Sequence, residues 1–133
     1  MKNLRLYKKE RLCSKTAIDA LFLPGADSGR RSAIAYPWRA VWRVSPRRQA
    51  DVNQFLVCVP KKRLRHAVER VAMRRKCREA YRLNRTLPDN ARVDIAFIYV
   101  GDSLTDYART EKSVRKLLAK ISAALTENPE ETR

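Results

Sequence analysis

The residues that could do chemistry gather in one stretch, from Lys61 to Arg85. This stretch holds 11 Lys and Arg side chains against only two acids, Glu69 and Glu79. Because the planar guanidinium of arginine matches the geometry of a phosphate, this composition is typical of a surface that binds a polyphosphate such as RNA or DNA. The alternative is a solvated charged face, but such faces normally mix both signs of charge. We therefore interpret the stretch as a nucleic-acid-binding surface.

The spacing of these cations predicts a helix over residues 68–85. At 3.6 residues per turn, five arginines fall along one side of this helix, with Arg75 at its border. Four other residues share a second side, which would pack against the rest of the protein. Like charges three or four residues apart destabilise a helix by roughly 0.2–0.5 kcal/mol per pair, so an external partner would offset that cost. The stripe consists of Arg70, Arg74, Arg78, Arg82 and Arg85, and the packing side of Met73, Cys77, Ala80 and Asn84.

Length and composition predict one fold with a basic surface. At 133 residues the chain suffices for one core, so we expect a single domain over residues 1–133. Its 44% hydrophobic content is too high for wholesale disorder, and its formal net charge is +16. Outside residues 61–85 the chain still carries 19 Lys and Arg against 12 acids. Such a charge favours salt-sensitive, largely sequence-independent binding to nucleic acid.

The sequence carries no signal for secretion, for a membrane or for a metal. Three cysteines, Cys13, Cys58 and Cys77, are odd in number and lack metal-ligand spacing, which is typical of a reducing compartment. No apolar run of a secretory signal follows the basic N-terminus, and no apolar stretch reaches the about 18 residues of a membrane span. An organelle transit peptide is an alternative for the first two dozen residues, although they also have the pattern of a docked helix. We expect a cytoplasmic protein.

The hydrophobic pattern predicts an α+β fold. Even-numbered positions from Ile34 to Val44 are apolar, which predicts one strand with a covered face, in which Pro37 requires an edge position or a bulge. Residues 55–59 form a continuous apolar run, typical of a central strand covered on both faces. In chain order we expect a basic arm (1–12), a helix capped by Ser14 (15–23), strands 32–44 and 55–59, the basic helix, a strand (93–100), a helix with a Ser103–Asp106 capping box (106–124) and a frayed tail (126–133).

Protein-based catalysis has no candidate residues. His66 is the only histidine, there are only three glycines, and no cluster of His, Cys and Asp has metal-ligand spacing. We interpret His66 as a polar surface contact rather than a general base. The residues therefore favour a binding module over a nuclease that acts through its own side chains, and they leave RNA and DNA both open as partners.

Residues 59–85, VPKKRLRHAVERVAMRRKCREAYRLNR, resemble the signature of the protein subunit of bacterial ribonuclease P. In that family a strand ends in a Lys-Lys pair and leads into an Arg-rich helix that closes on Arg-Glu-Ala-aromatic-Arg. The order of elements also agrees over roughly residues 5–125, from a Lys-Glu-Arg-Leu opening to a C-terminal helix. The matching residues are Lys61-Lys62 and Arg78-Glu79-Ala80-Tyr81-Arg82.

One departure concerns the Arg-Asn-Arg that the family's helix usually carries. The matching positions are Arg70, Val71 and Ala72, so only the first of the three is kept. The specific RNA contacts of the other two are in doubt. Compensation could come from a matching change in the partner RNA or from nearby cations, namely Arg63, Arg65 and Lys76.

The resemblance implies a fold similar to domain 2 of ribosomal protein S5. That fold is a two-layer α+β sandwich with α-β-β-β-α-β-α order and about four strands in one sheet. Its β-α-β crossover is left-handed, an exception to a rule that holds in about 98% of cases.

The resemblance also implies a function. The chain would be the RNA-binding subunit of ribonuclease P, a cytoplasmic ribonucleoprotein endonuclease that removes the 5′ leader from precursor tRNA, with one protein per RNA subunit. The catalytic centre and its magnesium ions would belong to the RNA, so we expect no catalytic residue, bound cofactor, metal or membrane contact in the protein. The alternative is a ribosomal or other structural RNA-binding protein of the same fold class, and behind it a DNA-binding protein.

The resemblance assigns two groups of site residues. A cleft for the single-stranded leader would be bordered by Phe22 and Tyr36, with Ile18 where the family often has an aromatic, because aromatic faces stack bases for roughly 1–3 kcal/mol each. Phe22 could equally be a core residue, and Trp38 and Trp42 are interpreted as core. The RNA subunit would be bound by Lys61, Lys62, Arg63, Arg65, Arg70, Arg74, Arg75, Arg78 and Arg82.

Overall fold

The computed structural model describes residues 12, 18, 31–44, 53–84 and 93–127. The basic arm, most of the first expected helix and the last six residues lie outside them, although Ile18 itself is helical. The last helix extends into the segment 126–133 that was expected to fray, since it ends at Glu127. The elements are β1 (Arg31–Ala35), β2 (Trp38–Val44), β3 (Gln54–Cys58), α2 (Ala67–Leu83), β4 (Val93–Tyr99) and α3 (Tyr107–Glu127).

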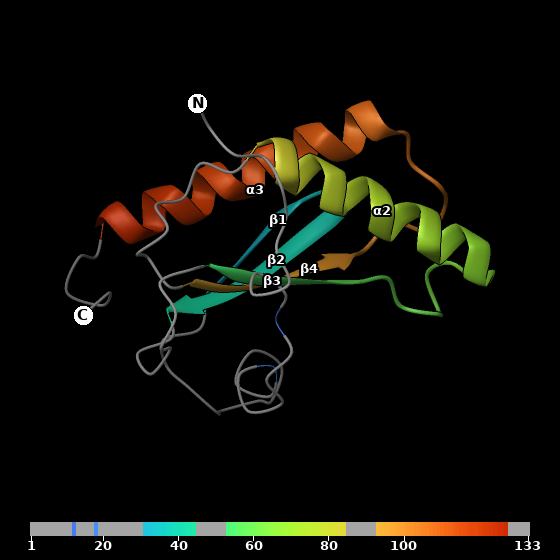
Figure 1. Ribbon diagram of the computed structural model, residues 1–133, viewed down its shortest axis with the longest axis horizontal. Coiled ribbons are helices and arrows are strands. Elements are labelled where there is room, and N and C mark those ends of the chain that lie inside the picture. The colour runs from blue at the N-terminus through green and yellow to red at the C-terminus, as the bar shows by residue number, and fades with distance from the viewer. Residues whose placement is uncertain (1–11, 13–17, 19–30, 45–52, 85–92, 128–133) are drawn as a thin grey trace.

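The four strands form one mixed sheet in the order β1-β2-β4-β3, with α2 and α3 lying across one of its faces (Figure 1). β2 pairs antiparallel with β1 and with β4, whereas β3 and β4 are parallel neighbours. Because parallel neighbours cannot be joined by a tight turn, the chain crosses between them through α2. The predicted α+β class, the four-stranded sheet and the β-α-β unit are confirmed, and the left hand of the crossover stays a prediction.

The single strand expected over residues 32–44 is a hairpin of two strands, so that prediction was wrong. The turn is Tyr36-Pro37, which contains a cis peptide bond, and Ala35 pairs with Trp38 across it. This register pairs odd positions of β1 with even positions of β2. The side chains that face the helices are therefore odd-numbered in β1 and even-numbered in β2. Ile34 and Tyr36 are consequently 57% and 58% exposed, although they continue the even-numbered apolar pattern.

The two faces of the sheet are covered by different parts of the chain. The face beneath α2 and α3 holds the main core, which includes Trp38 and Trp42, as predicted. On the opposite face Leu12 joins a smaller buried cluster, and the half-buried Ile18 packs against it. β3 lies at the end of the described sheet rather than at its centre, so the central position expected for residues 55–59 was wrong.

Aromatic side chains hold α2 against the sheet. Tyr81 of α2 stacks on Phe55 of β3, with ring centroids 4.1 Å apart, and meets Phe97 of β4 edge-on at 5.9 Å. Such pairs contribute about 0.5–1.5 kcal/mol each beyond the apolar area that they bury. The helix and its packing side are close to the prediction, because the buried residues of α2 are Met73, Cys77, Ala80 and Tyr81.

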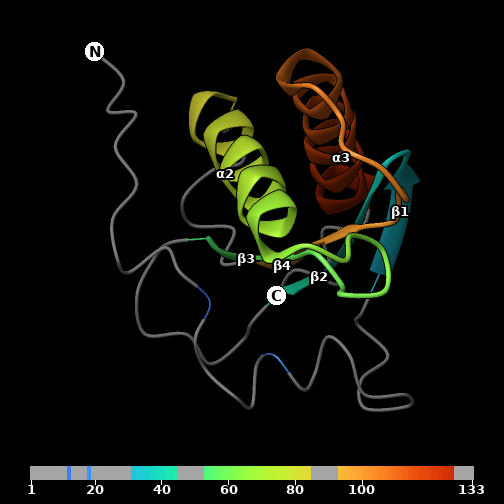
Figure 2. The same cartoon turned by 90° about the vertical axis from the view of Figure 1, so that its right-hand side faces the viewer.

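The last helix, α3, lies beside α2 on the same face of the sheet (Figure 2). Its cap differs from the prediction, which placed Ser103 at the N-cap. Asp106 caps the helix instead, since its Oδ1 accepts a hydrogen bond from the backbone N–H of Arg109 at 2.9 Å. The carbonyl of Ser103 accepts a hydrogen bond from the hydroxyl of Tyr99. The helix packs through Val114, Leu117, Leu118 and Ile121, all of them buried.

Gly101 follows β4 where the hairpin turn comes close. A Cβ atom at this position would lie 2.8 Å from the hydroxyl of Tyr99 and 3.0 Å from the Cβ of Pro37. The Tyr99 ring is fully buried and meets Trp38 edge-on at 5.0 Å, so it has little room to move. We expect Gly101→Ala to lower the free energy of unfolding by about 1–3 kcal/mol, measured by denaturant titration. Asp102→Ala, at the next and exposed position, should change it by less than about 0.5 kcal/mol, and equal losses would contradict the clash.

Candidate nucleic-acid interface

The structure brings all nine predicted RNA-binding cations together on two consecutive segments. Four lie on the loop between β3 and α2, and five lie on α2 itself. The buried side of α2 faces the sheet, and the helix also packs beside α3. We call these nine residues the α2 basic surface: Lys61, Lys62, Arg63, Arg65, Arg70, Arg74, Arg75, Arg78 and Arg82.

Two arginines of the α2 basic surface are engaged within the protein. Arg70 donates from Nη1 to the carbonyls of Leu64 and Arg65, both at 2.9 Å, and so holds the basic loop against the first turn of the helix. Arg82 forms an ion pair with Glu79, one turn earlier on the helix. The hydrogen bond from Arg82 holds the pKa of the Glu79 carboxyl below its ordinary value. These two guanidinium groups therefore have structural roles on the surface.

Three other arginines, Arg74, Arg75 and Arg78, make no hydrogen bond or ion pair with any described residue. Arg75 and Arg78 are exposed, whereas Arg74 is half-buried. Burial raises the pKa of the Cys58 thiol on β3, and the positive charge of Arg74 partly opposes that rise. Arg74 therefore lies near β3, at one edge of the sheet. Three guanidinium groups on one helix, without an ion pair in the part of the chain that the structure describes, suit a dense row of phosphates.

The two positions that depart from the family pattern, Val71 and Ala72, are both half-buried. Val71 lies within the basic face, because Arg75 follows it by one turn. Ala72 precedes Lys76 by the same step, which places it on the side nearer α3. Lys76 donates from Nζ to the carbonyl of Thr105 at 2.7 Å. The cation considered for compensation thus also ties α2 to the segment before α3.

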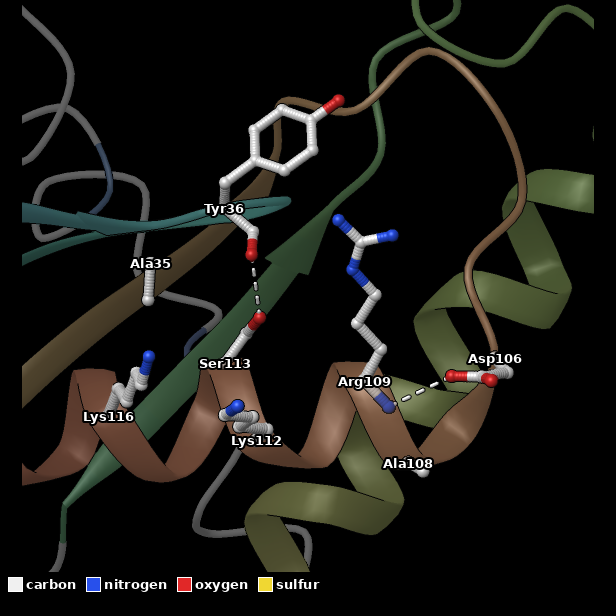
Figure 3. A pocket seen from close by; sticks show the side chains of 8 residues that line it. All are labelled: Ala35, Tyr36, Asp106, Ala108, Arg109, Lys112, Ser113 and Lys116. Atoms are coloured by element: carbon white, nitrogen blue, oxygen red, sulfur yellow. Dashed lines mark hydrogen bonds between the residues drawn. The ribbon is translucent and has the colours of Figure 1, made fainter.

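Two of the three residues expected to border a leader-binding cleft, Ile18 and Tyr36, are among the described residues. Ile18 packs on the sheet face opposite the helices. Tyr36 occupies the hairpin turn, where its carbonyl is directed towards Ser113 of α3 and its exposed ring projects away from that helix (Figure 3). The residue lines a depression of about 520 Å³. Phe22 lies outside the described residues. Tyr36 is therefore accessible to a ligand, whereas a cleft shared with Ile18 stays a prediction.

Sequence reasoning missed a second row of cations, which lies on α3. Its members recur at steps of three and four residues, so they share one side of the helix. The spacing is visible in the sequence, but the strong apolar repeat dominates the pattern of this helix. We call these residues the α3 basic row: Arg109, Lys112, Lys116 and Lys120.

The described part of the chain contains no group of three or more His, Cys, Asp or Glu side chains that could hold a metal ion. His66 is exposed at the N-cap of α2, and its side chain makes no capping hydrogen bond. Among the same residues, no helix has the length and apolarity to cross a membrane. The expected absence of a cofactor bound to the protein stays a prediction.

Comparison with known proteins decides the family. The family model described as ribonuclease P matches residues 6–122 of the chain. The chain belongs to the ribonuclease P protein family. Ribonuclease P protein components from two strains of Porphyromonas gingivalis are 36% and 35% identical to it over 123 residues, which cover 88% of this chain and 86% of theirs. The ribonuclease P protein of Staphylococcus aureus shares the fold, with a TM-score of 0.60 at 16% identity over 89% of this chain and 92% of that one.

The structure explains how the Arg-Glu-Ala-Tyr-Arg signature of this ribonuclease P protein is used. Ala80 and Tyr81 are buried and attach the helix to the sheet. Glu79 and Arg82 pair with each other on the surface. Arg78 alone is exposed with no partner among the described residues. One five-residue motif therefore combines a packing anchor with an exposed cation.

Proposed function

We propose that this chain is the subunit of ribonuclease P that binds the catalytic RNA and assists it in removing the 5′ leader from precursor tRNA. The α2 basic surface docks on the RNA subunit, and the exposed ring of Tyr36 receives a base of the leader. The observation that carries the docking proposal is the set of three guanidinium groups of Arg74, Arg75 and Arg78 on α2, which make no hydrogen bond or ion pair with any described residue.

The protein's part in this reaction is electrostatic. The catalytic RNA and its tRNA substrate are both polyanions, so their approach is opposed by charge repulsion, which cations must screen. A chain of net charge +16 supplies part of that screening when it binds. In this proposal the catalytic centre and its magnesium ions belong to the RNA.

Reconstitution with the cognate RNA subunit tests the function itself. The chain should lower the magnesium concentration at which the RNA removes the leader, because it replaces part of the cation screening. The measurement is the rate of leader removal across a magnesium titration, with and without the protein. A structural RNA-binding protein of the same fold, the alternative function, would bind RNA without shifting this titration.

Salt dependence tests the α2 basic surface. Each phosphate neutralised contributes about 0.7–0.9 to the slope of log affinity against log salt concentration. Arg74→Ala combined with Arg78→Ala should therefore flatten the slope for binding to the RNA subunit by about 1.4–1.8. Arg115→Ala, which removes an exposed cation from α3, is the control and should leave the slope unchanged. A wild-type slope in the double variant would place the docking surface elsewhere.

Two substitutions at Tyr36 test its contact with the leader. Tyr36→Ala should weaken binding of precursor tRNA to the holoenzyme by roughly 1–3 kcal/mol, the contribution of one stacked base, and leave mature tRNA binding unchanged. Tyr36→Phe keeps the aromatic face and should bind precursor tRNA like the wild type. Because Tyr36 is 58% exposed, removal of its ring should disturb folding little. If Tyr36→Ala retains the full preference for precursor over mature tRNA, the ring does not contact the leader.

A further inference from the structure

The α3 basic row forms a positively charged edge along β1, on the side of the helical layer away from the α2 basic surface. All four of its cations are exposed. Because they recur at steps of three and four residues, from Arg109 to Lys120, the row is straight and roughly 16 Å long at 1.5 Å per residue. A row of this length can contact several phosphates of one strand.

The fold fixes the position of this row. Lys120 donates from Nζ to the carbonyl of Ile34 on β1 at 2.9 Å. Ser113, which is buried on the same helix, donates from Oγ to the carbonyl of Tyr36 in the hairpin turn at 3.0 Å. Both bonds hold α3 against the β1 edge of the sheet. The cations are therefore presented on a rigid element, which lowers the entropic cost of binding.

The acids of α3 do not neutralise the row. Glu111 accepts hydrogen bonds at Oε2 from the hydroxyl of Tyr107 at 3.2 Å and from the amide of Asn84 at 3.1 Å, so it is directed towards α2. Asp106 lies near Arg109, but one of its carboxylate oxygens caps the helix. Within the part of the chain that the structure describes, the side chains of the row form no ion pair.

The surface beside the row offers charge without an aromatic face. Three of its cations, Arg109, Lys112 and Lys116, line the depression of about 520 Å³ between α3 and the hairpin turn. Tyr36 is the one aromatic residue among the described residues that line it, and its ring projects away from these cations (Figure 3). The depression therefore suits phosphates rather than unpaired bases, which need a ring on which to stack.

We propose that the α3 basic row holds a double-stranded segment of the catalytic RNA, separate from the segment that docks on the α2 basic surface. The protein thereby clamps one RNA at two points. A duplex hides its base faces and presents its phosphates outward, so it suits a straight row of cations that lacks a stacking ring. This inference rests on the proposed function and deepens it, since it adds a second contact surface for the same partner.

The arrangement of the layers favours the RNA subunit over the tRNA as the occupant. α2 and α3 lie side by side on one face of the sheet, so both basic surfaces belong to the helical layer (Figure 2). The leader is assigned to the ring of Tyr36, which projects away from α3 (Figure 3). An RNA that docks on α2 can therefore extend across the helical layer to α3 without meeting the substrate.

The two basic surfaces are far enough apart to hold different segments of the RNA. Arg74 lies near Cys58 of β3, whereas Lys120 contacts Ile34 of β1. β1 and β3 are the outer strands of the four-stranded sheet, and three strand spacings of about 4.8 Å separate them by roughly 14 Å. Once one segment has bound, the second contact is intramolecular, so it raises the overall affinity through a high effective concentration.

Hydroxyl-radical footprinting of the RNA subunit, bound to the full chain, tests the clamp. The wild type should protect two separate segments, one of them in a duplex. Lys112→Ala combined with Lys116→Ala should remove protection of the duplex segment alone, and Arg74→Ala combined with Arg78→Ala should remove protection of the other segment alone. Arg115→Ala is the matched control, because Arg115 is exposed on the same helix but outside the row, and it should retain both protections.

The salt dependence of assembly gives a second readout. The Lys112 and Lys116 double variant should flatten the slope of log affinity against log salt for the RNA subunit by about 1.8, since each phosphate of a duplex contributes about 0.9. Combination with the Arg74 and Arg78 double variant should add the two decreases, because distant sites act independently. Lys112→Arg combined with Lys116→Arg keeps both charges and should retain the slope and the footprint of the wild type.

Each other outcome overturns a different statement. An alanine double variant on α3 with both protections and a wild-type slope would overturn the α3 site and leave the proposed function in place. An intact footprint combined with weaker binding of tRNA to the holoenzyme would assign the row to the substrate and overturn the clamp. Loss of protection in a single-stranded segment would overturn the duplex as occupant. A wild-type chain that does not bind the RNA subunit would overturn the proposed function, and the α3 site with it.

Discussion

The contact of Tyr81 with Phe55 and Phe97 is the interaction on which the interface depends. It fixes the rotation of α2 about its own axis, because a large ring on one side of the helix occupies a defined place between two strands. A change of one residue in the facing position would turn the helix by about 100° and carry guanidinium groups towards the apolar core. With Tyr81 in place, Arg75 and Arg78 are exposed on a rigid element. A preorganised row of cations loses less conformational entropy when it binds phosphates than a flexible one would.

The topology of the sheet determines where the two basic surfaces lie. Parallel pairing of β3 and β4 requires α2 to cross above them, which joins the loop of Lys61 and Lys62 to the start of the basic helix. The antiparallel hairpin of β1 and β2 instead ends in the turn at Tyr36, next to the first turns of α3. Since β1 and β3 are the outer strands, the two connections place one basic surface at each edge. The separation of the two surfaces follows from strand order, which no local sequence pattern encodes.

Much of the fold could be predicted from the sequence, where long periodic patterns specify it. α2 and its buried residues Met73, Cys77 and Ala80 agree with the prediction, because a packing side repeated over several turns is a strong signal. The hairpin could not be found this way, since the even-numbered apolar positions continue through Tyr36-Pro37 and only the pairing shows the change of parity. In the sequence, the candidate site could be recognised only by its concentration of positively charged residues. The partners of Arg70 and Arg82 had to be seen in three dimensions, although Glu79 lies one turn from Arg82.

The free energy lost to charge repulsion can be compared with the free energy gained by apolar burial on α3. Like-charged neighbours raise the free energy of a helix by roughly 0.2–0.5 kcal/mol per pair, whereas full burial of one large apolar side chain stabilises by about 1.5–3 kcal/mol. α3 alone buries Leu117, Leu118 and Ile121, so packing outweighs repulsion along its basic row. Apolar packing can therefore offset the charge repulsion along α3 without an external partner. The uncompensated charge instead acts on encounter and affinity, because each phosphate that binds relieves repulsion already present in the folded protein.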